Sequence, residues 1–201
     1  MVKKSVLWLH KWLGLLSGLV VLIVSLTGCV YVFHDDLKVF FYSDKYYIAQ
    51  QSVNNQSAQA LPLSTLTAIA QKALPDGEEV TRIDLYPAKD RTWIFRAVKT
   101  NEEALTYTAY FKYNKRVFID PYTGKVQAVE NSKTEFFQLV LQLHMNLLLG
   151  KKIGHTVVSV STIMFLILTV TGLILWWPKK WKVKTLKKGL SFDFSVKWKR
   201  L

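Results

Sequence analysis

The stretch WLGLLSGLVVLIVSLTGCVYVF, residues 12–33, decides the fold, because it contains no Asp, Glu, Lys or Arg. A second stretch of this kind runs from Ile153 to Pro178. About 20 apolar residues in a helix are enough to cross the roughly 30 Å hydrocarbon core of a bilayer. Backbone polar groups have no other partner in lipid, so both stretches are expected to be helical. We predict transmembrane helices at residues 12–34 and 153–178; the alternative is two buried helices of a soluble protein.

Positive charge is concentrated at the two ends of the chain, although the net charge of all 201 residues is +13. Between Asp35 and Glu135, 13 basic and 13 acidic residues cancel. Excess Lys and Arg close to a transmembrane helix stays in the cytoplasm. We therefore expect a multi-pass protein of the bacterial cytoplasmic (inner) membrane, with cytoplasmic segments at 1–11 and 179–201 and an extracytoplasmic domain at 35–135. This distribution does not indicate nucleic-acid binding; the expected partner is the lipid bilayer. The basic residues near the helices are Lys3, Lys4, Lys11, Lys151, Lys152 and, in the tail, Lys179, Lys180, Lys182, Lys184, Lys187, Lys188, Lys197, Lys199 and Arg200.

The first apolar stretch has an alternative interpretation as an export signal. Leu26-Thr27-Gly28-Cys29 resembles a lipoprotein processing box, and Cys29 is the only cysteine. Against processing, the apolar run continues through Phe33 and exceeds the 7–15 residues of a signal peptide's apolar region. A lone cysteine excludes a disulfide within the chain.

The segment between the two apolar stretches has the pattern of a small α+β domain. Apolar residues at helical spacing predict a helix from Ser64, as N-cap, to Leu74, before Pro75. Asp120 to Lys125 is a predicted turn in which Pro121 and Gly124 set the backbone. The order therefore predicts a helix followed by an antiparallel meander. Further expected segments are strands at 80–86, 92–98, 107–113, 116–119 and 126–129, a linker at 50–59, and an outer interfacial or re-entrant helix at 136–152.

All four histidines lie in or beside the apolar stretches: His10, His34, His144 and His155. An ionisable side chain at membrane depth is costly and indicates a function inside the helix bundle. Imidazole is also an axial ligand of haem iron. The alternative is that each histidine lies among lipid headgroups, and that Gly28 and similar residues serve helix packing. The predicted soluble domain has no histidine and no nucleophile beside a base, so we predict no catalytic residue there.

The two apolar stretches repeat one pattern. His10 is followed 18 residues later by Gly28 in Ser25-Leu26-Thr27-Gly28, and His155 is followed 17 residues later by Gly172 in Thr169-Val170-Thr171-Gly172. His10 and His34, 24 residues apart, would be separated by about 36 Å along a helix, so they cannot share one iron. His144 falls on nearly the same helical face as His155 if the helix is unbroken at Gly150 and Gly154.

Several phrases together resemble the PepSY-associated transmembrane family. They are Leu9-His10-Lys11-Trp12-Leu13-Gly14-Leu15, Leu143-His144-Met145-Asn146-Leu147-Leu148-Leu149-Gly150 and Thr171-Gly172-Leu173-Ile174-Leu175-Trp176-Trp177-Pro178. The middle segment, with Val117-Phe118-Ile119-Asp120-Pro121-Tyr122-Thr123-Gly124-Lys125-Val126, resembles a PepSY domain. The resemblance implies b-type haem, held by histidines at positions 10, 144 and 155, and electron transfer to an external ferric siderophore. His34 does not clearly match the family pattern, and no metal beyond haem iron is implied.

By the same resemblance, family members continue after the basic tail into a second pair of helices opened by another Leu-His motif. We therefore expect this chain to correspond to an N-terminal half, a shortened member or a truncated reading frame, with a second membrane subunit or a homodimer supplying the partner of His10. Two non-enzymatic alternatives remain: a membrane-anchored module that binds a peptide, a peptidase or an envelope partner, and an accessory half-subunit. No Gly-x-Gly-x-x-Gly fingerprint of a nicotinamide or flavin site is present.

Overall fold

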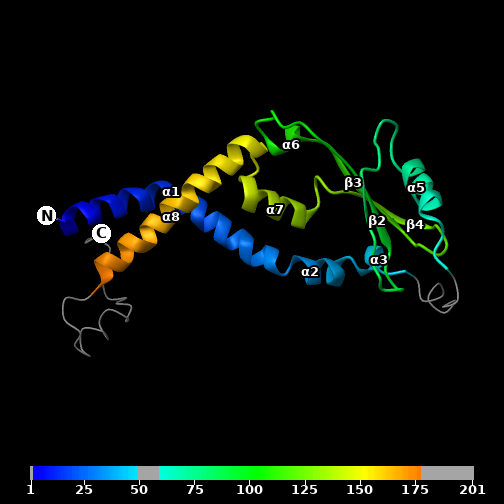
Figure 1. Ribbon diagram of the computed structural model, residues 1–201, viewed down its shortest axis with the longest axis horizontal. Coiled ribbons are helices and arrows are strands. Elements are labelled where there is room, and N and C mark those ends of the chain that lie inside the picture. Colours follow the sequence, from blue (N-terminus) through cyan, green and yellow to red (C-terminus); the bar gives the residue numbers. More distant parts are fainter. Residues whose placement is uncertain (1, 49–58, 178–201) are drawn as a thin grey trace, which may run out of the picture. The chain divides into compact units, whose positions relative to one another are not determined.

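Figure 1 shows a computed structural model, which describes residues 2–48 and 59–177. Almost all of the predicted linker and the whole predicted cytoplasmic tail lie outside these residues. The chain divides into two compact units. One is formed by the described parts of residues 1–21 and 160–201, and the other by residues 22–159.

Two long apolar helices carry the predicted membrane spans. Helix α1 runs over Val2–Val32 and helix α8 over Lys151–Trp176. Their apolar segments, Lys4–Val32 and Lys151–Trp176, have mean hydropathies of 2.4 and 2.3 and are long enough to cross a bilayer. Most of their large apolar side chains are exposed, as expected of helices that face lipid rather than a protein core. The two predicted apolar helices are therefore confirmed, and each is longer than a bilayer requires.

The middle of the chain forms one four-stranded antiparallel sheet in the order β1-β2-β3-β4, as the meander predicts. The start of the third strand was predicted wrongly. The expected strands at 107–113 and 116–119 are instead a helical turn and one continuous strand, because the Thr106 side chain accepts a hydrogen bond from Ala109 N–H and caps the turn. Tyr107 and Tyr110 of that turn are buried. The elements are β1 (Arg82–Asp84), β2 (Trp93–Thr100), α6 (Tyr107–Tyr110), β3 (Phe111–Ile119) and β4 (Val126–Asn131).

Helix α5, Leu63–Lys72, covers one face of the sheet (Figure 1). Leu66 of the helix is fully buried, and Phe95 and Val117 of the sheet lie in the same core cluster. Strand side chains alternate between two faces, so this cluster uses every second residue of β2 and β3. The helix begins two residues earlier than predicted: Pro62 is the N-cap and makes no side-chain hydrogen bond, so Ser64 is not the cap.

The predicted turn before β4 is confirmed. Asp120 Oδ1 accepts hydrogen bonds from the N–H groups of Tyr122 at 2.9 Å and Thr123 at 3.4 Å. Gly124 has φ of +73°, which the absence of a Cβ allows. Its N–H donates to the Asp120 carbonyl at 2.9 Å. The turn therefore sets the register of β3 against β4.

Three short helices connect the sheet to the long apolar helices. They are α2 (His34–Phe41), α3 (Ser43–Tyr46) and α7 (Phe136–Asn146). Helix α7 ends at Asn146, before the expected end at residue 152, because Leu147 and Leu148 have φ of +56° and +57°. The Leu148 carbonyl accepts a hydrogen bond from Tyr107 N–H at 3.1 Å, which holds this turn. His144 and His155 therefore lie on separate helices.

Candidate functional site

His10, on α1, contacts the Thr-Gly pair of α8. Its Nδ1 lies 2.8 Å from Oγ1 of Thr171. The Thr171 hydroxyl donates its proton to the Ile167 carbonyl, also at 2.8 Å. The oxygen of Thr171 is then an acceptor, so Nδ1 of His10 carries the ring proton.

Gly172 makes this approach possible. A Cβ added at residue 172 would lie 3.3 Å from Cε1 of His10, closer than ordinary van der Waals contact. The half-buried imidazole of His10 thus packs against helix backbone where any larger residue at 172 would displace it.

His144, on α7, makes the same kind of contact with the other Thr-Gly pair, on α1. Its Nδ1 lies 2.9 Å from the carbonyl oxygen of Val24 and 3.4 Å from Oγ1 of Thr27. A carbonyl oxygen only accepts, so Nδ1 of His144 also carries the proton. A Cβ added at Gly28 would lie 3.0 Å from Cε1 of His144. The sequence pattern linked His10 to the pair on its own helix, and His155 to the pair on α8. In the structure His10 instead contacts the pair of α8, and His144, which was not part of the pattern, contacts the pair of α1.

This protonation leaves the second nitrogen of each ring, Nε2, with a free lone pair in the neutral imidazole. No described residue hydrogen-bonds to Nε2 of His10 or of His144. An imidazole whose Nδ1–H is held by a protein oxygen and whose Nε2 is free is the arrangement that metal-ligating histidines adopt. The two residues therefore fit an axial ligand of haem.

The other two predicted site residues have different surroundings. His34 lies with Nδ1 2.6 Å from the Tyr31 carbonyl and Nε2 3.1 Å from Oδ1 of Asp35, so both its ring nitrogens face acceptor oxygens. His155 is exposed on α8. In residues 2–48 and 59–177, no histidine hydrogen-bonds to another, and no group of three or more His, Cys, Asp or Glu residues is placed to hold a metal ion.

The sheet face opposite α5 carries a row of arginines that the sequence analysis did not identify. Arg82, Arg96 and Arg116 are direct cross-strand partners on β1, β2 and β3, and Glu130 on β4 completes the row. Like charges placed opposite each other destabilise a sheet. Asp84 offsets this repulsion, because its carboxylate accepts hydrogen bonds from Nε of both Arg82 and Arg96.

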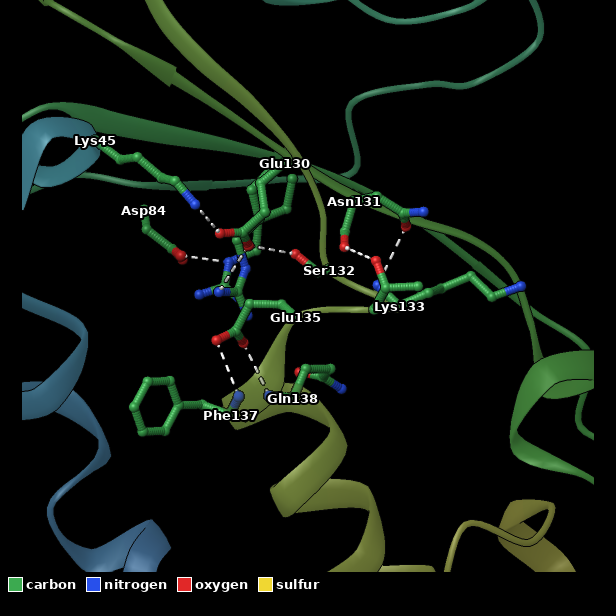
Figure 2. Close-up of polar contacts among 12 residues, drawn as sticks. Lys45, Asp84, Glu130, Asn131, Ser132, Lys133, Glu135, Phe137 and Gln138 are labelled. Atoms are coloured by element: carbon green, nitrogen blue, oxygen red, sulfur yellow. Dashed lines mark hydrogen bonds and ion pairs between the residues drawn. The ribbon is translucent and has the colours of Figure 1, made fainter. Parts of the chain in front are cut away.

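Figure 2 shows Glu130, the last member of this row, and Glu135, which follows β4. Glu130 forms an ion pair with Lys45 at 3.3 Å and accepts a hydrogen bond from the Ser132 hydroxyl at 2.9 Å. Glu135 is the N-cap of α7, where its carboxylate accepts from the N–H groups of Phe137 at 2.9 Å and Gln138 at 2.8 Å. Both carboxylates are thus already engaged by protein donors.

A cavity of about 500 Å³ lies next to this row, within residues 22–159. Its lining includes Lys38, Arg91, Arg96 and Arg116. Burial lowers the pKa of Lys38, and the positive charge of Arg116 lowers it further. Strand alternation is the sequence signal that could have grouped Arg96 with Arg116, because every second residue of β2 and β3 lies on this face. The cavity residues from α2 and from the loop before β2 carry no such signal.

Comparison with known families agrees with the sequence motifs. A family model described as PepSY-associated TM region matches residues 7–200, nearly the whole chain. No curated protein matches the chain at a significant level.

Proposed function

Because the chain belongs to the PepSY-associated TM family, we propose that this membrane protein binds b-type haem and takes part in electron transfer across the bacterial cytoplasmic membrane to ferric siderophores or other ferric complexes. The observation that carries the proposal is the shared arrangement of His10 and His144, each with Nδ1–H bound to a protein oxygen and Nε2 free. Haem, when bound, supplies reversible one-electron chemistry at its iron.

In this proposal His10 and His144 would each hold a haem iron through Nε2. Thr171 and the Val24 carbonyl fix the tautomer and the orientation of the two rings, and a hydrogen bond at Nδ1 raises the basicity of a ligating imidazole. Family resemblance makes His155 a further ligand. His34 is less suited to this role, because Nε2 faces the carboxylate of Asp35 at 3.1 Å.

The proposal includes a direction of transfer. The basic residues beside the two apolar helices favour cytoplasmic termini and an extracytoplasmic sheet domain. Electrons would enter from a cytoplasmic or membrane donor and leave on the side of the sheet domain. A second membrane subunit or a second copy of this chain would supply a further ligand for the haem held by His10.

The first test is the visible absorption spectrum of the full chain, expressed with haem supplied and purified in detergent. We expect a Soret band and, after reduction, split α and β bands. His10→Ala and His144→Ala should each lower the haem content per polypeptide, whereas His34→Ala should leave it unchanged. Absence of a Soret band in the unaltered protein would contradict the proposal and favour the non-enzymatic module.

The second test separates haem binding from electron transfer. Protein in liposomes that enclose a reductant should reduce an external ferric siderophore, and His10→Ala should slow this reduction. Protein that binds haem but reduces no ferric complex, even with added membrane partners, would limit the function to haem binding.

A further inference from the structure

The cavity beside the arginine row has the size of a small-molecule site. Its volume of about 500 Å³ falls within the range of roughly 300–1,000 Å³ that is usual for ligand pockets. Apolar side chains, Ile94, Phe137 and Leu141, form part of its wall. The rest of the lining is mostly charged or polar, so the cavity is suited to a charged ligand rather than to an apolar one.

Arg91 is held at the cavity without a carboxylate partner. Its guanidinium carbon lies 4.9 Å, 5.1 Å and 5.3 Å from the ring centres of Tyr86, Tyr47 and Tyr46. Stacking on aromatic rings orients a guanidinium without using its N–H groups. Within the described chain, Nε of Arg91 is buried and has no acceptor, and no ion pair involves this side chain.

Arg116 is the second arginine at this cavity whose positive charge is not fully balanced by a carboxylate. The residue is 5% exposed, and its nearest carboxylate, Glu130, lies 3.5 Å from Nη1. Glu130 also serves Lys45 and Ser132, so its negative charge is shared. Nε of Arg116 is buried without an acceptor in the described chain.

The remaining carboxylates near the cavity do not balance these cations. Asp84 already binds two arginines, and Glu135 caps α7 through backbone N–H groups. Asp35 and Asp36 line the cavity but are exposed, so water screens their charge. The buried part of the cavity therefore presents unpaired donors and excess positive charge.

We propose that this cavity binds a small molecule through an oxyanion group, a carboxylate or a phosphate, held by Arg91 and Arg116. The planar fork of a guanidinium matches the two oxygens of a carboxylate or phosphate. The oxyanion accepts from guanidinium N–H groups of these two arginines, which line the cavity, and offsets their uncompensated positive charge. The tyrosine and aliphatic walls contact the remainder of the ligand. This site does not depend on haem, and its residues are separate from His10 and His144.

The oxyanion has two possible sources, since Tyr31, in the last turn of α1, and His34, at the start of α2, also line the cavity. One is a soluble organic acid or inorganic phosphate; the other is an anionic lipid headgroup. Both offer the same chemistry to the arginines, so the experiment includes an arm for each source.

The test is calorimetric titration of the full purified chain, in nanodiscs of phosphatidylcholine, with citrate and with inorganic phosphate. Trimethyl citrate, which is neutral, controls for the shape of the molecule. We expect at least one anion to bind and the ester not to bind. Arg91→Gln should weaken anion binding about tenfold or more, the usual loss for a charged hydrogen bond. Arg82→Gln is the matched control, because Arg82 carries the same charge on the same face, is 71% exposed and does not line the cavity.

The outcomes separate the proposal from its alternatives. Equal weakening in Arg91→Gln and Arg82→Gln, with both variants retaining the circular dichroism of the parent, would show bulk electrostatics and overturn the site. The proposed site is also overturned if neither citrate nor phosphate binds and phosphatidylglycerol, as the only anion in the sample, shows no binding that depends on Arg91. If phosphatidylglycerol nanodiscs block citrate binding, the source is the lipid headgroup; equal citrate affinity in both lipids indicates a soluble ligand. His10→Ala should bind anions normally, so failure of the haem proposal leaves this result unaffected.

Discussion

Gly28→Ala should disturb the His144 contact, and Gly18→Ala, on the same helix, should not. A Cβ at residue 28 would lie 3.0 Å from Cε1 and 3.3 Å from Nδ1 of His144, whereas a Cβ at residue 18 meets nothing within 4 Å. Both substitutions gain about 1 kcal/mol of helix propensity. At residue 28, overpacking costs about 1–3 kcal/mol. Retreat of the ring also weakens the 2.9 Å hydrogen bond to Val24, worth about 1 kcal/mol.

The two variants should therefore differ in stability by about 2–4 kcal/mol, with Gly18→Ala the more stable. Thermal unfolding in detergent, followed by circular dichroism, measures this difference. A double-mutant cycle with His144→Ala identifies its cause, because removal of the ring should make Gly28→Ala neutral or stabilising. The reasoning is refuted if the two alanine variants shift the melting temperature equally, or if Gly28→Ala remains destabilising without the imidazole.

Three further substitutions test other parts of the structure. Thr171→Val removes the acceptor of a histidine Nδ1–H and should cost about 1–3 kcal/mol, whereas Thr169→Val, at an exposed hydroxyl bonded only to its own helix, should cost less in the same detergent unfolding assay. Leu66→Ala, in the fully buried core, should destabilise the sheet domain by about 2–5 kcal/mol, and Leu63→Ala, 44% exposed, by under about 0.5 kcal/mol in urea denaturation. Burial raises the pKa of Tyr46 from 10.0 to about 12. The contribution of the Tyr46 phenol to stability is therefore full below about pH 10 and is lost as pH rises to about 12. Tyr46→Phe should flatten the decline in unfolding free energy over that range, and the absorbance of tyrosinate follows the titration.

Uncharged runs and the alternation of apolar with polar residues predicted which segments face lipid and which form the sheet. The absence of charge over residues 12–33 and 153–178 predicted α1 and α8, because uncharged runs of this length are typical of helices that cross a bilayer. Alternation predicted the sheet, and the Asp120 turn was predicted from residues with fixed backbone preferences. The start of β3 was mistaken because Tyr107, Ala109, Phe111 and Tyr113 alternate as in a strand, although the cap by Thr106 makes a helical turn.

The candidate sites depend on contacts between segments far apart in the sequence, which periodicity does not encode. The histidines and the Thr-Gly pairs were each recognised, but His10 and Thr171 are 161 residues apart, and His144 and Thr27 are 117 apart. The arginine row depends on strand register, and a shift of one residue would move Arg96 to the opposite face. Arg91 comes from a loop, where no period applies.

The two Thr-Gly contacts also bear on whether the histidines serve packing alone. Ser17, fully buried on α1, donates its hydroxyl to the Leu13 carbonyl, as Thr27 and Thr171 do to carbonyls of their own helices. A glycine follows each of these three hydroxyl residues. A Cβ added at Gly18, after Ser17, would meet nothing within 4 Å, whereas at Gly28 and Gly172 an imidazole lies in that space. Apolar side chains would pack there without placing an ionisable group in an apolar helix pair. The recurrence of imidazole in both places, with the same ring nitrogen bound, supports the proposal that Nε2 of each histidine serves as a ligand.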